Sequence, residues 1–355
     1  MKATLGLDMA GIPAETTRLL MASNQHPGVM RPFLDDRGQG WVQAPVMNGQ
    51  GQRQVQSFPV SNALLRYDEY KIFDNVITQT TRTRTGVFTK LSQIVQPLVL
   101  PTAMAHSMVQ YQMTDTYGQA TLSMDPARRT VTERGNYDTG LTPLPIVHVD
   151  FSINIRELMQ SRANGVGLDT VHAENGAAAI AEKIERLTVG TDDEFYYGGG
   201  YIYGLTNHPD RLTGTITSPE ADGWEPETLC DELAAQMATM YNAKNYGPYH
   251  ILYGADWLTY MQKRYNQYDS TPLAAAVRRL DNIASFEIAN FLTGYQMIMI
   301  DPQAKYVRTI IGMAPTPVQW SNSPMDLQMK IMGILIPQIR SDYDGNCGVL
   351  HLDVA

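Results

Sequence analysis

The chain has 355 residues, 43% of them hydrophobic and 18% charged. A charged share below the ~25% of ordinary soluble chains suits a subunit with extensive protein contacts, although a large monomer could show the same bias. The formal net charge of −9 and the pI near 5.3 argue against a protein that grips nucleic acid through a basic face, although an acidic wall could enclose DNA without binding it. Its two cysteines, Cys230 and Cys347, lie far apart without a CxxC pattern, so we expect no disulfide framework, no zinc site and a reducing compartment.

Residues 1–20 do not have the pattern of a signal peptide. Asp8 and Glu15 interrupt the apolar stretch, and no basic segment precedes a continuous hydrophobic one. No run elsewhere approaches the ~18 uncharged apolar residues of a membrane span. We therefore expect a protein that is made and used in a cytoplasm-like setting, with no membrane partner.

Residues 1–60 have the composition of an arm rather than of a domain. The stretch from Gly38 to Gln56 contains six Gln and four Gly, and its apolar residues follow no helical period. Such a segment cannot build a core alone. A tail without fixed structure is one interpretation, but Trp41 and Phe58 favour an extended arm that becomes ordered against a neighbour.

A helix is predicted to begin at a cap on Ser61 or Asn62 and to run to about Thr81. Its apolar stripe is formed by Leu65, Ile72, Phe73, Val76 and Ile77. From Gly86 to Pro101 the pattern is more extended.

Residues 103–150 are predicted to form a long two-stranded excursion. Alternation over Met108–Met113 and over Ala120–Met124 indicates strands, and Asp125-Pro126 and Arg134–Asn136 mark turns. Because an isolated hairpin with little apolar bulk is marginal in water, this excursion needs its own domain or a neighbouring subunit to lie on.

The clearest helix is predicted over about 170–189, with caps offered by Asp169 and Thr170. Its apolar face consists of Ala173, Ala177, Ile180, Ala181, Ile184 and Leu187, which recur at the spacing of an amphipathic helix. Glu182 and Arg186 are expected to form an i,i+4 pair on the opposite, solvated side.

A compact α/β unit is predicted after a glycine-rich and aromatic stretch over 195–225. Its expected elements are a helix from Thr228 with apolar Leu229, Leu233, Met237, Met240 and Tyr241, a strand over Tyr249–Tyr253, helices over about 255–265 and 272–280, and paired strands near 295–300 and 305–311. The chain is then expected to return as a hairpin of Met329–Ile339 and Gly348–Val354 around a turn at Asp342–Asn346.

Asp138-Thr139-Gly140 matches the triplet of aspartic proteases, which need two such carboxylates at the ends of apolar strands to share a proton. Here Gly135, Asn136 and Tyr137 precede the triplet, and no second copy exists. A dimeric enzyme could supply the second copy, but we interpret the triplet as part of a plain loop. A hydrolase built on Asp138 stays a distant alternative.

Gly198-Gly199-Gly200, with Gly204 after it, does not fit a nucleotide-binding loop. Aromatic residues flank the glycines where that loop needs a preceding strand and a following helix N-terminus. We interpret this segment as a flexible surface loop.

The remaining polar patterns predict no metal or cofactor site. The seven histidines show no HxH, HxxxH or HExxH spacing, so we interpret His208 beside Asp210 as a loop pair, and Asp192–Glu194 as a solvated acidic cluster. Asp342 and Asp344 superficially match a calcium loop, but the glycine comes too early and no Glu follows at the required place. With no GxSxG motif either, we expect no catalytic, cofactor-binding or metal-binding residue and no enzyme activity.

Six motifs follow one another in an order known from one protein family. They are Leu65–Lys71 (LRYDEYK), Ala120–Asp125 (ATLSMD), Leu144–Phe151 (LPIVHVDF), Leu168–Thr170 (LDT), Tyr203–Pro209 (YGLTNHP) and Ile336–Tyr343 (IPQIRSDY). In this order they resemble the major capsid proteins of tailed bacteriophages with the Hong Kong ninety-seven fold, a family shared in part with encapsulin shells. The resemblance covers roughly residues 61–355.

The resemblance implies an α+β fold of this Hong Kong ninety-seven type. Its implied parts are an extended N-terminal arm (1–60), a helix and connecting strand (61–102), an E-loop hairpin (103–150), a P-domain (151–225) with a spine helix (170–189), a compact α/β A-domain (226–318) and P-domain return strands (319–355). A-domains would meet around the capsomer axes, while the arm and the E-loop would lie over neighbouring subunits.

The same resemblance implies a structural protein without cofactors, which self-assembles as hexameric and pentameric capsomers into an icosahedral head shell. That shell would enclose double-stranded DNA without sequence-specific binding, with scaffold, portal and decoration proteins as partners. The protein would be found in the virion after assembly in the host bacterial cytoplasm. An encapsulin-type nanocompartment is the nearest alternative, and the long arm before Ser61 favours the phage interpretation.

Some members of that family weld their shells through a Lys–Asn isopeptide bond whose lysine lies in the E-loop. This chain has no lysine between Lys90 and Lys183. We therefore predict that its subunits are not joined by such a bond.

Overall fold

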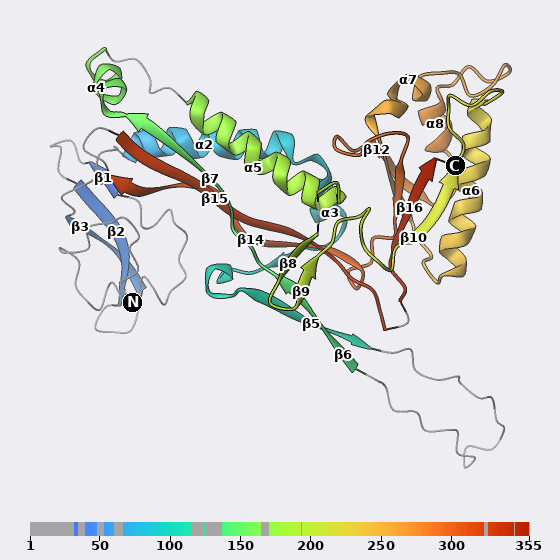
Figure 1. The fold of residues 1–355 in the computed structure, drawn as a ribbon, viewed down its shortest axis with the longest axis horizontal. Coiled ribbons are helices and arrows are strands. Elements are labelled where there is room, and N and C mark those ends of the chain that lie inside the picture. The colour runs from blue at the N-terminus through green and yellow to red at the C-terminus, as the bar shows by residue number, and fades with distance from the viewer. Residues whose placement is uncertain are drawn as a thin grey trace.

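A computed structural model of the chain describes residues 32–34, 40–47, 53–59, 67–114, 122, 124, 137–164, 170–192, 194–322, 326–343 and 345–354. The predicted caps Ser61, Asn62 and Asp169, the apolar Leu65, the turns Asp125-Pro126 and Arg134–Asn136, and the acidic Asp193 and Asp344 lie outside the described residues. Figure 1 shows two bodies side by side, with a two-stranded ribbon that projects from the first. No described helix is both long enough and apolar enough to cross a membrane.

The first body is a four-stranded sheet with two long helices over one face (Figure 1). Its strand order is β4-β14-β15-β7, and its core strands β14 and β15 are antiparallel. The elements are β4 (Leu98–Val99), β7 (Val147–Asn154), β14 (Val307–Asn322), β15 (Asp326–Ile339), α2 (Tyr67–Arg84) and α5 (Val171–Val189). Phe73 and Ile77 of α2 and Ile180 and Ile184 of α5 belong to one buried cluster with Met329 of β15, which anchors both helices on the sheet.

The helix predicted over about 170–189 is confirmed as α5. All six residues of its predicted apolar face are buried, and none is more than 7% exposed. Gly176 brings α5 close to β15, because a Cβ at that position would lie 3.0 Å from Cδ1 of Ile331. Gly190 ends the helix with a φ of 94°, a left-handed conformation that glycine adopts without strain.

The predicted pair of Glu182 and Arg186 on α5 is wrong. The carboxylate of Glu182 instead accepts a hydrogen bond from Arg84 of α2 at 3.3 Å, and the guanidinium of Arg186 lies 5.4 Å from the ring centroid of Phe291. Partners from other elements therefore replace a local pair, which is worth only a few tenths of a kcal/mol (about 0.2–0.5) in an isolated helix.

The first predicted helix is present as α2, although it ends at Arg84 rather than near Thr81. Phe73 and Ile77 are buried as expected, whereas Ile72 is 43% exposed. Adjacent helical residues point about 100° apart, so Ile72 leaves the face that Phe73 presents to the core. A further helix that the sequence pattern did not predict, α4 (Ile155–Asn164), follows β7.

The extended segment predicted for Gly86–Pro101 is wrong over its first half, which is helix α3 (Gly86–Ile94). This helix is capped from outside, because the carboxylate of Glu185 on α5 accepts hydrogen bonds from the N–H groups of Val87 and Phe88, each at 3.0 Å. The acceptor is almost a hundred residues away in the sequence, so no local capping pattern indicates the helix.

The second body is a five-stranded sheet with the order β10-β16-β13-β11-β12. The outer pairs β10 with β16 and β11 with β12 are parallel, and the inner pairs are antiparallel. Its elements are β10 (Leu212–Ile216), α6 (Pro226–Asn242), β11 (Tyr249–Tyr253), η4 (Ala255–Trp257), α7 (Leu258–Met261), α8 (Leu273–Val277), β12 (Ile283–Ile288), β13 (Met297–Ile300) and β16 (Val349–Val354). The strand predicted over Tyr249–Tyr253 is confirmed, whereas the helices expected over 255–265 and 272–280 are shorter than predicted.

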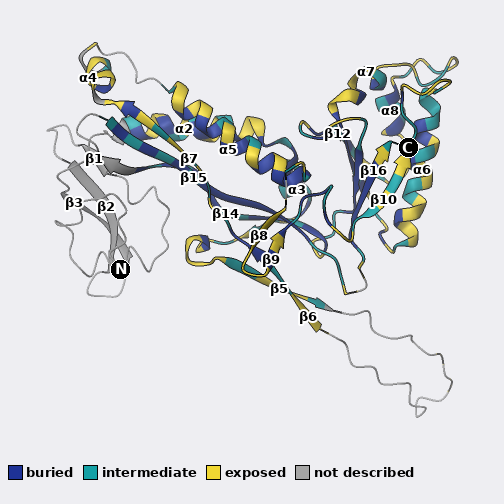
Figure 2. Ribbon diagram, in the orientation of Figure 1, coloured by how far each residue is buried: buried dark blue, intermediate teal, exposed yellow. Residues whose placement is uncertain are grey.

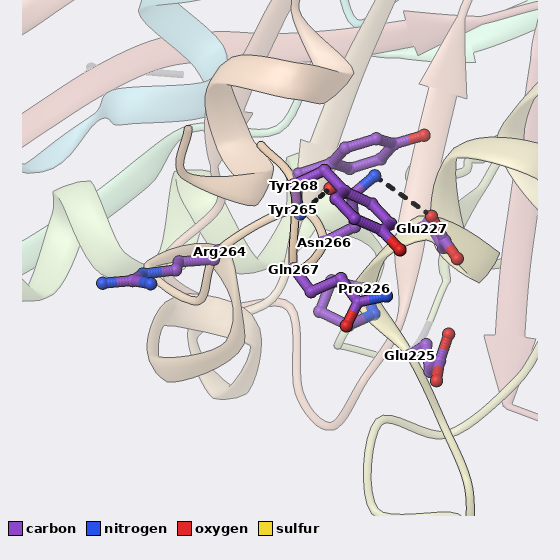
Figure 3. A pocket seen from close by; sticks show the side chains of 8 residues that line it. All are labelled: Glu225, Pro226, Glu227, Arg264, Tyr265, Asn266, Gln267 and Tyr268. Carbon is purple, nitrogen blue, oxygen red and sulfur yellow. Dashed lines mark hydrogen bonds between the residues drawn. The ribbon is translucent and has the colours of Figure 1, made fainter. Parts of the chain in front are cut away.

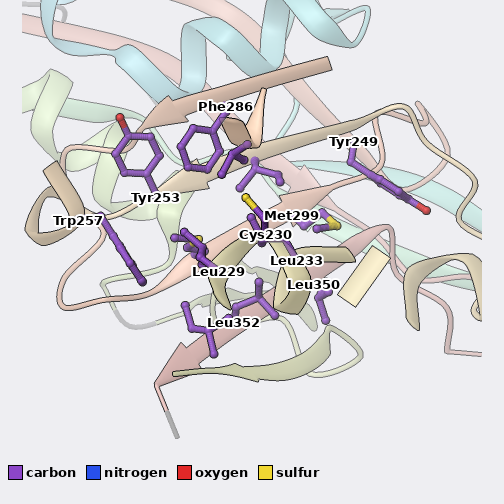
Figure 4. Packing of buried hydrophobic residues seen from close by; sticks show 14 of the residues in the cluster. Leu229, Cys230, Leu233, Tyr249, Tyr253, Trp257, Phe286, Met299, Leu350 and Leu352 are labelled. Carbon is purple, nitrogen blue, oxygen red and sulfur yellow. The ribbon is translucent and has the colours of Figure 1, made fainter. Parts of the chain in front are cut away.

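Figure 4 shows the core between α6 and one face of this sheet, where Leu229 and Leu233 meet Trp257 and Phe286. Tyr241, which the sequence pattern placed on the apolar face of α6, is 58% exposed, whereas the adjacent Met240 is fully buried, because adjacent helical residues point about 100° apart. On the opposite face of the sheet, α3 packs against β11, β13 and β16 through one buried cluster. The two bodies are thus joined by apolar contact.

Two predicted strand pairings are wrong. The strands of the predicted terminal hairpin exist as β15 and β16, but β15 pairs with β14 and β7 while β16 pairs with β13 and β10. The strands near 295–300 and 305–311 exist as β13 and the start of β14, and they also lie in different sheets. Both predictions assumed that strands adjacent in sequence pair, whereas here the chain crosses from one body to the other.

The projecting ribbon consists of β5 (Met108–Thr114) and β6 (Tyr137–Pro143), paired antiparallel from Met108 with Pro143 to Thr114 with Tyr137. The first predicted strand is therefore confirmed. The second strand was predicted too early, since Leu122 and Met124 are described without strand structure, and the partner of β5 follows after Asn136.

The segment interpreted as a flexible loop around Gly198 is a tight hairpin instead. Its strands are β8 (Phe195–Tyr197) and β9 (Gly200–Ile202). Gly198 and Gly199 form the two-residue turn with φ values of 58° and 86°, the positive values that such hairpin turns require.

The described residues before α2 form three strands, β1 (Pro32–Leu34), β2 (Gly40–Met47) and β3 (Arg53–Pro59). They pair antiparallel in the order β1-β2-β3. The predicted arm therefore contains a small sheet of its own, which Figure 1 shows at the end of the first body away from the second.

Candidate interaction surface

The residues singled out as possible catalytic groups do not come together. Asp138 lies on strand β6 rather than in a loop, opposite Met113, because the ribbon continues to Tyr137. Its carboxylate is exposed and accepts a hydrogen bond from the N–H of Thr139 at 2.7 Å. Among the described residues no second carboxyl group is bonded to it.

His208 is buried, and burial lowers its pKa to about 4. Its Nδ1 accepts a hydrogen bond from the backbone N–H of Asp210 at 3.2 Å, while the Asp210 carboxylate accepts one from the hydroxyl of Ser341 at 2.6 Å. The imidazole is thus held by backbone and not by the carboxylate, so these three residues do not form a proton relay.

The acidic residues near possible metal positions have protein partners. Asp192 pairs with Lys183 at 2.7 Å, and Asp342 accepts a hydrogen bond from the N–H of Asn346 at 2.8 Å, which closes a turn. Within the described part of the chain, no group of three or more His, Cys, Asp or Glu residues is placed to hold a metal ion.

The base of the β5–β6 ribbon is fixed to the first body by side-chain bonds. Gln338 of β15 donates to the hydroxyl of Thr142 at 2.7 Å and accepts from Nε of Arg308 at 2.5 Å. The guanidinium of Arg340 lies 5.4 Å from the ring centroid of Tyr111 on β5. These contacts hold both ribbon strands where they leave the sheet.

Toward its outer end the described part of the ribbon becomes more exposed. Along β6, burial falls from the buried Thr142 to the exposed Tyr137, and Figure 2 shows the outer part of β6 as exposed. Leu122 and Met124, between the two strands, are fully exposed at 104% and 105%. Full burial of such side chains is worth roughly 1.5–3 kcal/mol each, so a neighbouring surface would stabilise this ribbon.

A second exposed apolar patch lies on the β8–β9 hairpin, which packs beside the ribbon. Tyr196 and Tyr201 are 59% and 40% exposed, and their ring centroids lie 4.7 Å apart. Tyr201 in turn stacks on Tyr203 at 5.4 Å. Exposed aromatic side chains held in fixed positions are typical of protein interfaces.

Besides the exposed ribbon and the patch on the β8–β9 hairpin, the surface has a cleft of about 460 Å³ at one end of the second body (Figure 3). It is lined by Glu225, Pro226, Glu227, Arg264, Tyr265, Asn266, Gln267 and Tyr268. Sequence reasoning missed it, because its two halves lie at the start of α6 and after α7. The polar and aromatic run Arg264–Tyr268 was the available signal, since it lies between the two helices predicted over about 255–265 and 272–280.

One family model matches residues 60–352, and its description is a family of unknown function, DUF6260. The chain belongs to this family. The comparison with curated proteins found no match to this chain.

Solved structures resemble this DUF6260 member in fold at low sequence identity. The capsid of Myoviridae phage XM1 is similar with a TM-score of 0.57 and 11% identity, over 73% of this chain and 90% of that one. A virus-like particle from Pyrococcus furiosus is similar with a TM-score of 0.56 and 11% identity, over 81% and 99%. A chain of Mycobacterium phage Bobi gives 0.50 and 15% identity, over 75% and 90%. The predicted α+β fold of the Hong Kong ninety-seven type is thereby confirmed.

Proposed function

We propose that this chain is the major capsid protein of a tailed bacteriophage, a structural protein whose copies form an icosahedral head shell around double-stranded DNA. The observation that carries the proposal is the β5–β6 ribbon, which is fixed at its base and presents the fully exposed Leu122 and Met124 beyond it. On a fold shared with the capsid of phage XM1, such a ribbon gains stability by lying over a neighbouring copy.

The parts of the chain receive roles on the same basis. We assign the ribbon to the E-loop of 103–150, the four-stranded sheet with α5 to the P-domain, and the five-stranded sheet with α6 to the A-domain. Strand pairing supports placing 212–216 and 349–354 with the A-domain as well. The small sheet within 1–60 would lie with the arm over a neighbour.

The net charge of the chain suits a shell that encloses DNA better than a protein that binds DNA. With a net charge of −9, the subunit has no general attraction for phosphate, so packaged DNA would stay free of the wall. The proposed partners are further copies in hexamers and pentamers, with scaffold, portal and decoration proteins. The proposed location is the virion, after assembly in the host cytoplasm, with no enzymatic step and no cofactor.

An encapsulin-type compartment is the second candidate, because the virus-like particle from Pyrococcus furiosus is covered over 99% of its length. Electron microscopy of particles from the cells that naturally produce the protein separates the candidates. Shells that contain nuclease-protected DNA support the phage capsid, and small shells filled with protein support the compartment. Discrete monomers or dimers would contradict both and revive a hydrolase built on Asp138.

Substitution of the ribbon tip tests the observation itself. Leu122→Asp with Met124→Asp should prevent shell formation, since both carboxylates would have to be buried against a neighbour. The control exchange Leu122→Met with Met124→Leu keeps the apolar surface and should assemble. Normal shells from the Asp variant would show that the ribbon tip is not an interface.

A further inference from the structure

The cleft at the end of the second body is negatively charged. Glu225 precedes α6 and Glu227 lies in its first turn, and neither forms an ion pair with any described residue. The N-terminus of α6 supplies about half a positive charge there, which two carboxylates exceed. Burial is the first cause of the raised pKa of Tyr265, and the charges of Glu227 and Asp231 are among those that add to it.

The same cleft offers flat and polar surfaces that suit a guanidinium group. Tyr268 is 89% exposed, so its ring has almost no partner within the chain, and Figure 3 shows it beside Tyr265. Asn266 keeps the loop in place, because its Oδ1 accepts from the N–H groups of Tyr268 at 2.9 Å and Asp269 at 2.6 Å. Arginine pairs with carboxylates in a planar fork and stacks on aromatic rings, so this combination fits an arginine side chain.

One such arginine is present on the same tip but directed elsewhere. Figure 3 shows the side chain of Arg264 pointing away from Glu225 and Glu227. Its backbone is held by a bridge to Pro272, which fixes the direction in which the exposed side chain leaves the body. The neighbouring Lys263 is not equivalent, because its ammonium group lies 4.2 Å from the ring centroid of Tyr260.

We propose that Arg264 of one subunit enters the Glu225 and Glu227 cleft of the next copy, so that copies associate head to tail into a closed ring. Because Arg264 and the acidic cleft are different surfaces of the same subunit, their contact is heterologous. Repetition of a heterologous contact closes a ring when the rotation between neighbouring subunits fits. The proposal rests on the proposed shell function and names a contact between neighbouring second bodies. Tyr265 and Tyr268 would flank the incoming guanidinium.

Charge reversal and charge exchange test this contact in the full-length chain. Arg264→Glu would place a third carboxylate against the cleft, and sedimentation velocity should show that at least about tenfold more protein is needed for half of it to associate. Glu225→Lys with Glu227→Lys should give a similar loss. Arg264→Lys keeps the charge but loses the planar fork, so it should weaken association less than Arg264→Glu does. The chain that carries all three reversals restores opposite charges at every contact and should recover association.

The outcomes separate the ring contact from the shell proposal. Unchanged association of Arg264→Glu, or a triple variant no better than the single ones, would overturn the contact. Thermal unfolding of the unassembled variants should match the wild type, because these side chains lie at the surface. If the wild type forms rings that respond as expected but never closes into shells, the shell function fails while the contact stands.

Discussion

Glu185 should make the stability of the subunit fall as the pH rises. Burial raises the pKa of this carboxyl from 4.5 to about 7, against the opposing effect of its hydrogen bonds from Phe88 and Val87. A carboxyl with a raised folded-state pKa favours the folded chain fully below the unfolded pKa, and this contribution is lost as the pH rises through the folded value. The difference between 4.5 and 7 corresponds to about 3 kcal/mol of unfolding free energy.

The variant Glu185→Gln isolates this effect. At pH 4.5 it should be less stable than the wild type by about 1–3 kcal/mol, because its amide can accept from only one of the two backbone N–H groups without presenting a donor to the other. Above pH 7 the wild type carries a buried charge and the variant does not. The stability of the variant relative to the wild type should therefore rise by about 3 kcal/mol between pH 4.5 and 8.

Urea unfolding of unassembled subunits, followed by circular dichroism at several pH values, measures this difference. Subtracting the two profiles removes the contributions of all other titrating groups. Glu182→Gln is the matched control, since Glu182 lies on the same helix with an exposed side chain and its pair with Arg84 is worth about 0–1 kcal/mol. Parallel profiles for Glu185→Gln and the wild type would refute the reasoning.

Three further results are expected. Gln338→Ala should remove the hydrogen bond to Thr142 and loosen the base of the ribbon. Limited proteolysis would detect this as faster cleavage within the E-loop, and unchanged cleavage would show that the bond is dispensable. Gly204→Ala should destabilise the subunit strongly, because its Cβ would lie 2.3 Å from the Cα of Gly190, and a melting temperature within a few degrees of the wild type would contradict that packing. Mature particles on denaturing gels should run as a single monomer band, and a ladder of covalent multimers would contradict the prediction that the lysine-free E-loop forms no isopeptide bond.

The parts of the fold that local sequence decides were predictable. The stripe of α5 repeats from Ala173 to Leu187, about four turns of helix, so its buried face follows from periodicity alone. The strand Tyr249–Tyr253 is a short apolar run between turn signals and was also predicted at its correct bounds. In both cases the residues of the element itself are enough to predict its type and its bounds.

Other elements depend on residues far away in the chain. Helix α3 begins where Glu185 accepts two of its free N–H groups, and nothing between Gly86 and Ile94 predicts that acceptor. The partners of β15 and β16 depend on how the chain passes between the bodies, so adjacency in sequence gave the wrong pairs. The cleft of Glu225 and Tyr268 likewise forms only when α6 and the loop after α7 come together.

The position of β16 sets a condition on the timing of folding. This strand lies between β10 and β13 and pairs with both, yet it is synthesised after every other described strand of that sheet. Until Val349–Val354 has emerged from the ribosome, the sheet lacks an interior member and its edges stay unpaired. A chain whose synthesis has not passed Val354 therefore lacks the finished second body, and with it the rigid end that a ring contact needs. Association through this body therefore waits until Val349–Val354 has been synthesised and paired.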